Sequence, residues 1–193
     1  MVKRFSIMIG LWAAVSFIAV VGAGAATLSL SDAWNLVCSR VPITVSTTFA
    51  SGDNFKSVWK WENSKWAVYL PGDIDGGDAY AGTKGFNVLS TISPGEGFWI
   101  NSTGSQDVTV DGTAQTSNTL SLIAGWNLIG ATISSSITAG TVFSDSTKFT
   151  SVWNWDAVNS KWSVYLPGEN TSGEYAQSKG FGCGSFATTA ANI

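Results

Sequence analysis

The sequence predicts an all-β protein made of two tandem small antiparallel β units, each barrel-like or sandwich-like. The first observation behind this is composition: of 193 residues, 45% are hydrophobic and only 12% are charged, enough apolar material to bury a core. Second, aromatic residues combine with abundant Ser, Thr and Gly, a mixture that favours strands over helices. Third, apolar residues alternate with a period of two. Beyond the first 25 residues, only short helical turns near 44–49 and 137–143 are expected.

The chain also repeats itself, which indicates two copies of one unit. The offset between the copies grows from 92 to 96 residues, so insertions lie in the turns of the second copy. Phe49 and Phe55 return as Phe143 and Phe149. The other matched segments are 27–30 with 119–122, 34–36 with 126–128, 57–61 with 151–155, 64–72 with 160–168, and 84–86 with 179–181.

The first 25 residues have the three regions of a secretory signal peptide. Lys3 and Arg4 precede an apolar run over 5–21, and small residues follow at 22–26, so cleavage is expected after Ala25. An uncleaved anchor is the alternative, because about 17 apolar residues is the lower limit for crossing a bilayer. We therefore expect Sec-type export to the extracellular space, the cell surface or the periplasm. No membrane span is expected after the leader is removed.

The predicted units occupy residues 26–101 and 119–193, with a linker over 102–118. The linker contains a short strand pattern at Val108–Val110. The first unit ends in Pro-Gly-Glu-Gly-Phe-Trp-Ile-Asn at 94–101, and no counterpart of this closing motif follows Phe181. The second unit is thus either truncated or completed by a strand from elsewhere. An open sheet edge of this kind invites pairing with a partner or self-assembly.

A β-hairpin is predicted within each unit. In the first, Trp59 and Trp61 alternate with Lys60 and Glu62, Asn63-Ser64 has turn chemistry, and a second strand runs to Pro71-Gly72. The pattern predicts that the tryptophan face packs in the interior and the charged face meets solvent. The same burial is expected for Trp34, Trp99 and Trp126.

The order of these motifs resembles a Trp-rich repeat of secreted bacterial surface proteins. The residues that carry the likeness are Trp-Asn-Leu at 34–36, Val-Trp-Lys-Trp at 58–61, Tyr-Leu-Pro-Gly at 69–72, Lys-Gly-Phe at 84–86, and the closing motif. It covers 27–101 well and 119–181 in part. The resemblance implies a small β unit that accompanies larger exported proteins and has no established chemistry.

Composition excludes several classes of function. The chain has no His, which removes His-based triads and His-ligated metals. Without the leader, 8 basic side chains face 13 acidic ones, so nucleic acid is not an expected partner. Glu96 has no paired carboxylate in sequence for glycoside hydrolysis, and the Ser and Thr residues have no base to activate them. No enzymatic activity is predicted.

Three sets of residues are candidates for a site. Exposed indoles stack on sugar rings, so Trp59, Trp61, Trp66, Trp153, Trp155 and Trp162 would bind carbohydrate if they lay on a surface. Asp73, Asp75 and Asp78 alternate in a glycine-containing loop that could wrap Ca²⁺, although a solvated acidic turn explains them equally well. Cys38 and Cys183 would form a disulfide in an oxidising compartment, or act as small buried hydrophobes. No other cofactor is expected.

The function predicted from the sequence is an exported, non-enzymatic structural, adhesion or protein-interaction module at the cell surface. Its partner would be a protein or a cell-surface polymer. The alternative is a carbohydrate-binding protein that uses exposed tryptophans.

Overall fold

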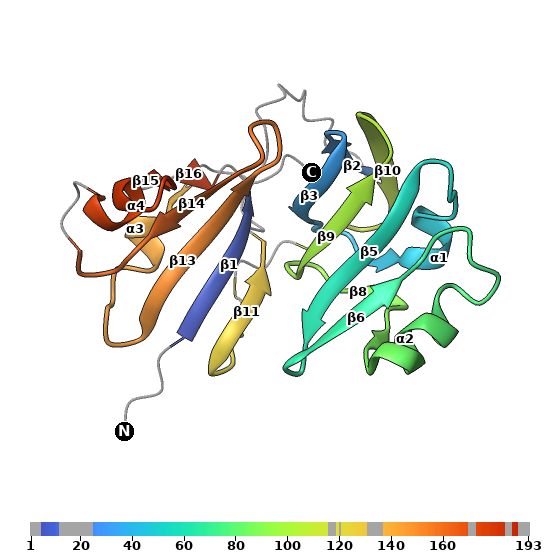
Figure 1. Ribbon diagram of the computed structural model, residues 1–193, viewed down its shortest axis with the longest axis horizontal. Helices are drawn as coiled ribbons and strands as arrows, with labels where there is room; N and C mark the ends of the chain where they lie inside the picture. The colour runs from blue at the N-terminus through green and yellow to red at the C-terminus, as the bar shows by residue number, and fades with distance from the viewer. Residues whose placement is uncertain are drawn as a thin grey trace.

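The computed structural model describes residues 5–11, 25–115, 119, 121–130, 137–169, 173–183 and 187–188. Two units lie side by side, each built on a five-stranded sheet (Figure 1). The first unit comprises the described residues from 25 to 115. The second comprises those from 119 to 188 together with strand β1. The predicted all-β class is confirmed, since strands dominate the described residues.

The sheet of the first unit has the strand order β3-β9-β5-β6-β7. These strands are β3 (Ala33–Cys38), β9 (Gly97–Ser102), β5 (Phe55–Glu62), β6 (Lys65–Tyr69) and β7 (Asn87–Val88). The predicted hairpin is confirmed as the antiparallel pair β5 and β6. β9, the strand of the closing motif, is antiparallel to both β3 and β5, so it is an interior strand.

Two short ribbons complete the first unit. β2 (Ala25–Leu30) pairs with β10 (Gln106–Asp111), and β4 (Ile43–Thr44) pairs with β8 (Thr91–Ile92). β10 lies within the segment 102–118 that the sequence analysis assigned to a linker. Its Val108 and Val110 are buried in the core of the first unit. This part of the predicted linker is therefore structural, and the first unit extends beyond Asn101.

The sheet of the second unit has the corresponding order β11-β1-β13-β14-β15. The strands are β11 (Gly125–Ile129), β1 (Phe5–Leu11), β13 (Phe149–Asp156), β14 (Lys161–Tyr165) and β15 (Gly182–Cys183). A ribbon of β12 (Ile137–Thr138) and β16 (Ala187–Thr188) accompanies it. β1 comes from the predicted leader and lies between β11 and β13, where the first unit has β9 (Figure 1).

In the part of the chain that the structure describes, four short helices connect the strands. The helical turns predicted near 44–49 and 137–143 are confirmed as α1 (Val45–Thr48) and α3 (Ala139–Val142). Two further helices, α2 (Asp78–Lys84) and α4 (Glu174–Ser178), are not predicted by the sequence pattern, because each buries a single alanine and shows no apolar period. Within the described ranges, none of the helices has the length and apolar character needed to cross a bilayer.

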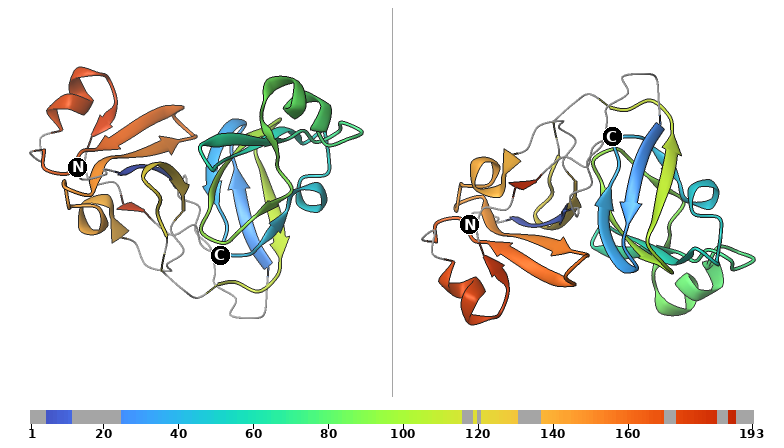
Figure 2. Two further views of the ribbon diagram at one scale, coloured as in Figure 1. Left: turned by 90° about the horizontal axis from the view of Figure 1, so that it is seen from below. Right: turned by 90° about the horizontal axis from the view of Figure 1, so that it is seen from above.

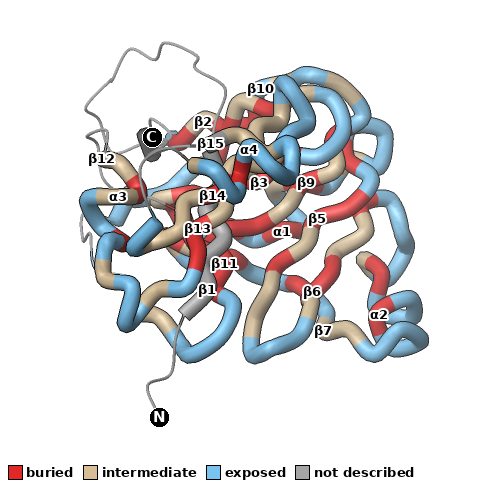
Figure 3. The backbone as a smooth tube through the Cα atoms, turned by 60° about the vertical axis from the view of Figure 1, so that its left-hand side comes forward, coloured by how far each residue is buried: buried red, intermediate tan, exposed pale blue. Residues whose placement is uncertain are grey.

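The core of the first unit lies between its sheet and the β2/β10 ribbon (Figures 2 and 3). Phenylalanines fill it: Phe49 contacts Phe55 and Phe98 with ring centroids 5.3 and 6.1 Å apart. In the second unit, Phe143 and Phe149 make the corresponding contact at 5.2 Å. The phenylalanine pair that returns in the sequence is thus the centre of each core.

The asparagine of the Trp-Asn-Leu motif organises the entry to each sheet. Asn35 Nδ2 donates to the carbonyls of Ser31 and Ala33 at 2.8 and 3.1 Å, and Asn35 Oδ1 accepts from the Ser31 amide at 2.9 Å. Asn127 makes the same three bonds, with the same lengths, to Ile123 and Gly125. The amide side chain therefore satisfies three backbone groups at the entry to each Trp-Asn-Leu strand.

Replacing Asn35 by Ala tests this role. The change leaves three backbone groups without their partner, so we expect the free energy of unfolding to fall by about 2–3 kcal/mol. Urea denaturation followed by circular dichroism measures it. Asn101→Ala on β9 is the matched control, because Asn101 Oδ1 accepts no hydrogen bond among the described residues. An equal loss in both variants would contradict the assigned role.

Candidate functional site

The tryptophans lie on the opposite side of each sheet from the hydrophobic core, which corrects the prediction that they pack in the interior. None of the nine described tryptophans is buried: seven have intermediate exposure, and Trp34 and Trp126 are 41% and 45% exposed. The face predicted to meet solvent is the buried one, since Lys60 is only 6% exposed and Asn154 only 1%. Each sheet therefore has a phenylalanine core on one side and an indole layer on the other.

The indole layers of the two sheets face each other and line an open groove of about 460 Å³, here called the aromatic groove. Its described lining is entirely aromatic and consists of Trp34, Trp59, Trp66, Phe86, Trp99, Trp155 and Trp162. The structure brings four of the six predicted tryptophans into this groove. Trp34, Trp99 and Phe86 are additional groove residues that the sequence does not single out, because alternation of aromatic residues along a strand is typical of a packed core.

Edge-to-face contacts hold the rings of the groove in place. In the first unit, Trp59 lies against Trp66 and Phe86, with centroids 6.3 and 5.3 Å apart. The second unit repeats this arrangement with Trp153, Trp162 and Phe181 at 6.2 and 5.2 Å. Aromatic pairs of this geometry contribute about 0.5–1.5 kcal/mol each beyond area burial. The groove walls are therefore preformed rather than assembled from loose side chains.

Trp99 of β9 joins the two units. Its ring lies 5.8 Å from that of Trp155 and 5.7 Å from that of Trp162, across the boundary between the units. The indole nitrogen of Trp155 donates to the carbonyl of Trp34 at 2.9 Å. The groove thus depends on how the two sheets dock.

Glycine at the closing motif permits this docking. A Cβ at Gly97 would lie 2.9 Å from the backbone nitrogen of Ile129, so no other residue fits without moving β11. Next to it, the amide of Gly130 donates to the carbonyl of Gly95 at 2.9 Å. The Pro-Gly-Glu-Gly loop is therefore both the turn into β9 and the contact that positions the second unit.

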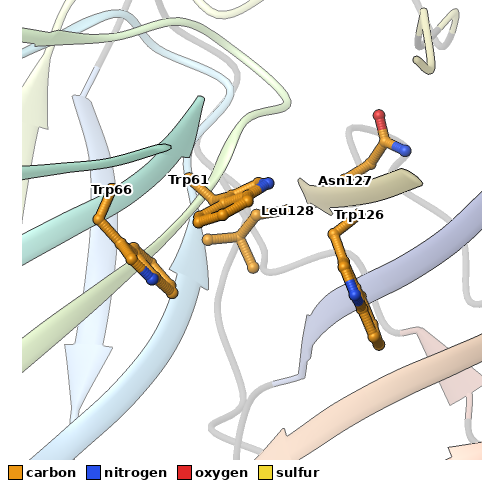
Figure 4. A pocket seen from close by; sticks show the side chains of 5 residues that line it. All are labelled: Trp61, Trp66, Trp126, Asn127 and Leu128. Atoms are coloured by element: carbon orange, nitrogen blue, oxygen red, sulfur yellow. The ribbon is translucent and has the colours of Figure 1, made fainter. Parts of the chain in front are cut away.

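A smaller hollow of about 240 Å³ lies beside the aromatic groove (Figure 4). Trp61 and Trp66 stand on one side of it, and Trp126 stands on the other. Leu128 lies between them, and Asn127 completes the described lining. This hollow contains Trp61, the remaining predicted tryptophan of the first hairpin, and it adjoins β11 of the second unit.

Glu96, which the sequence analysis weighed as a catalytic acid, is committed to an ion pair. Its Oε2 lies 3.0 Å from the ammonium of Lys60, and Glu62 binds the same ammonium at 2.8 Å. Glu96 also accepts from the amide of Ser93 at 2.7 Å. Desolvation alone lowers the pKa of Lys60, but its hydrogen bonds to Glu62 and Glu96 and their charges outweigh this, and the net pKa is raised. Lys60 is buried because two carboxylates neutralise it.

The variant Glu96→Gln tests this structural role. We expect it to lower the free energy of unfolding by about 1 kcal/mol at neutral pH, a figure discounted for the partial exposure of Glu96. The raised pKa of Lys60 means that this stabilisation is complete below 10.5 and is lost as the pH rises through the raised value. Denaturant unfolding at pH 7 and above pH 10.5 measures both, with Glu174→Gln as an exposed control. A difference that persists unchanged in alkali would contradict the assignment.

The acidic loop around Asp75 supports α2. Asp75 Oδ1 accepts from the amide of Gly77 at 2.9 Å, and Oδ2 accepts from the amide of Ala79 at 3.0 Å. These bonds, led by the one from Ala79, lower the pKa of Asp75. Among the residues that the structure describes, no group of three or more acidic or cysteine side chains is placed to hold a metal ion. Asp73, Asp75 and Asp78 are not brought together as a ligand set.

The variant Asp75→Ala separates the capping role from calcium binding. We expect a lower melting temperature at neutral pH, because the amides of Gly77, the N-cap residue, and of Ala79, in the first turn of α2, lose their acceptor. Since the pKa of Asp75 is lowered, this difference is present above the ordinary value of 3.8 and disappears as the pH falls through the lowered value. Thermal melts measure it, with Asp73→Ala as the control in the same loop. A melting temperature of the unaltered protein that drops on addition of chelator would instead favour a calcium site.

Cys38 is buried near the contact between the units, and burial raises the pKa of its thiol to about 12. A Cβ at Gly130 would overlap the Cys38 side chain, so the two residues are packed closely. The Cys183 side chain lies outside the described residues. Pairing of Cys38 with Cys183 therefore stays a prediction.

No protein-family model, no curated protein and no solved structure matches the chain.

Proposed function

We propose that the protein is an exported, non-enzymatic interaction module that binds a neutral, extended segment of a partner protein in the aromatic groove. The observation that carries the proposal is the groove itself: seven aromatic side chains from both units line one open surface. Exposed apolar surface of this kind marks sites of interaction. Export and the duplication of the unit rest on the leader pattern and on the matched segments of the sequence.

The chemistry of the lining favours a neutral, largely apolar ligand. Indole and phenyl rings carry no formal charge, and the cation Lys60 lies on the opposite face of the sheet, where Glu62 and Glu96 neutralise it. Aromatic-lined grooves recognise polyproline II segments, whose extended backbone is already ordered before binding. A proline-rich peptide is therefore the ligand class that fits best.

The same seven residues supply no nucleophile, acid or base for a reaction on a bound ligand. Glu96 is the carboxylate that the sequence offers as a candidate catalytic acid. Its side chain is bound to the ammonium of Lys60 and to the amide of Ser93. Binding without turnover is the function that this lining supports.

Carbohydrate binding is the second candidate, and the exposure of Trp34 and Trp126 favours it. These two indoles are 41% and 45% exposed, which leaves ring surface free to stack on a sugar. Sugar recognition also needs hydrogen-bonding groups beside the rings, and the described groove lining offers few. For this reason the peptide ligand ranks above the glycan.

The variant Trp59→Ala tests the groove. Trp59 lines it and contacts Phe86, so its loss should weaken binding of a proline-rich peptide by about tenfold or more. Titration calorimetry measures the affinity. Trp126→Ala is the matched control, because Trp126 lines the smaller hollow and is not among the groove residues.

Neutral polysaccharides titrated against the same variants separate the two candidates. Binding of a polysaccharide but not of the peptide, with loss in Trp126→Ala, would replace the proposal by the carbohydrate alternative. Binding of neither ligand class would remove the groove as a recognition site.

A further inference from the structure

The position between β11 and β13 is built like the position between β3 and β5. In the first unit, Trp99 of β9 lies opposite Leu36 of β3 and Trp59 of β5. Because β9 is antiparallel to both neighbours, β3 and β5 run parallel to each other. The closing strand β9 pairs with the backbones of both β3 and β5. This pairing fixes the offset between β3 and β5 along the strand direction, so that Leu36 lies level with Trp59.

The second unit has the same offset. Met8 of β1 lies opposite Leu128 of β11 and Trp153 of β13, which are the sequence counterparts of Leu36 and Trp59. The strands β11 and β13 of the second unit therefore have the relative position needed to pair with a strand between them, as β3 and β5 do with β9. The difference is one of direction: β1 runs parallel to both neighbours, whereas β9 runs antiparallel.

The smaller hollow occupies the place that corresponds to the ring of Trp99. In the first unit, this ring lies 6.1 Å from Trp34 and also contacts Trp155 and Trp162 of the other sheet. The counterparts of these three residues are Trp126, Trp61 and Trp66, and all three line the smaller hollow. An apolar cavity of about 150 Å³ holds benzene. The hollow, at about 240 Å³, is large enough for an indole.

We propose that the place between β11 and β13 is a strand-acceptor slot for an antiparallel strand of Gly-Phe-Trp-Ile chemistry, supplied by a partner polypeptide, and that the tryptophan of this strand fills the smaller hollow. The added strand completes the second sheet in the way β9 completes the first. A second copy of this chain is not the donor, because its own β9 is an interior strand of its first unit.

The polar and charged residues near the slot determine which donor strand it prefers. Asn154 replaces Lys60 in the second unit, it is 1% exposed, and its Oδ1 accepts no hydrogen bond from any residue that the structure describes. Asp156 stands where the first unit has Glu62. A carboxylate at the Glu96 position of the donor would meet no cation here. The slot therefore prefers a donor strand with a hydrogen-bond donor at that position.

β1 is an exchangeable occupant of the slot. Parallel pairing is slightly less stable per residue than antiparallel pairing, so an antiparallel strand competes favourably. β1 also belongs to the segment that the sequence predicts to be a cleaved leader, and its removal leaves two rows of backbone groups without partners. The inference does not rest on the proposed ligand of the aromatic groove.

The test uses the full chain and a dye-labelled peptide with the sequence of residues 93–102, SPGEGFWINS. Ile7→Pro removes a backbone donor from the middle of β1 and weakens its pairing. Fluorescence anisotropy should show the peptide binding to this variant about tenfold more tightly than to the unaltered chain. Glu96→Gln within the peptide should tighten binding further, about threefold, and Trp99→Ala within the peptide should weaken it about tenfold.

Matched protein variants locate the tryptophan of the peptide. In the Ile7→Pro background, Trp126→Ala should weaken binding about fivefold or more, while Tyr175→Ala, at an exposed aromatic residue of the second unit that lines neither the smaller hollow nor the aromatic groove, should leave binding unchanged. Equal effects of the two variants, or binding that ignores the tryptophan of the peptide, would overturn the proposal. A dimeric mass of the Ile7→Pro variant without peptide would assign the slot to a second copy and would also overturn it.

Hydrogen exchange on the unaltered chain keeps the test informative if Ile7→Pro fails to fold. Excess peptide should raise exchange at the amides of 5–11 while the amides of 149–156 stay protected. A spin label at the amino end of the peptide should broaden the NMR signals of Asp156 rather than those of Phe149, as antiparallel pairing requires. Unchanged exchange over 5–11, or broadening at Phe149, would exclude the antiparallel slot.

Discussion

Each sheet of this protein depends on the strand between its Trp-Asn-Leu strand and its hairpin. That strand pairs on both sides, so its backbone supplies hydrogen bonds to two neighbours that do not contact each other in the ladder. Without it, two rows of amide and carbonyl groups lose their partners at once, and the sheet divides into an isolated strand and a hairpin. In the first unit β9 fulfils this requirement, and in the second unit β1 does so. The same strand also carries Trp99 to the boundary between the units, so that sheet closure and unit docking rest on one segment.

The closing motif combines these roles through a few residues. Its glycines let the loop before β9 approach the backbone of β11, and its glutamate neutralises a lysine on the core side of the sheet. Aromatic side chains then fill the other side. A buried ammonium is costly unless its charge is matched, so Lys60 is compatible with the core face because Glu62 and Glu96 both bind it. The turn, the neutralising carboxylate and the aromatic side chains are therefore supplied by neighbouring residues of one short motif.

Much of the architecture follows from the sequence, and the exceptions have physical causes. The β5/β6 hairpin, the short helices α1 and α3, and the strand class were predictable because alternation and turn chemistry are local signals. Alternation of apolar and polar residues shows that a strand has two different faces, but it does not show which of them packs against the second layer of the unit. Here the choice is made by the β2/β10 ribbon, which covers the Lys60 face, and by the neutralising partner Glu96, 36 residues further on. The assignment of tryptophan to the core failed for this reason.

The aromatic groove shows the same limit at the level of the site. Six of its seven lining residues are tryptophans that stand out in the sequence, yet Trp155 and Trp162 join Trp99 only because the second unit docks on the first. Docking in turn requires Gly97 to lie against Ile129, a close approach that no periodicity encodes. Leu36 and Val68, on the indole side of the first sheet, are buried, whereas the indole rings above them keep part of their surface exposed. The reason is that a single sheet face covers a ring from one side only, whereas a two-layer core encloses it. Each indole in the layer between the two sheets is therefore buried on one side and exposed to the groove on the other. This arrangement gives the protein a preformed groove while both units keep their own packed cores.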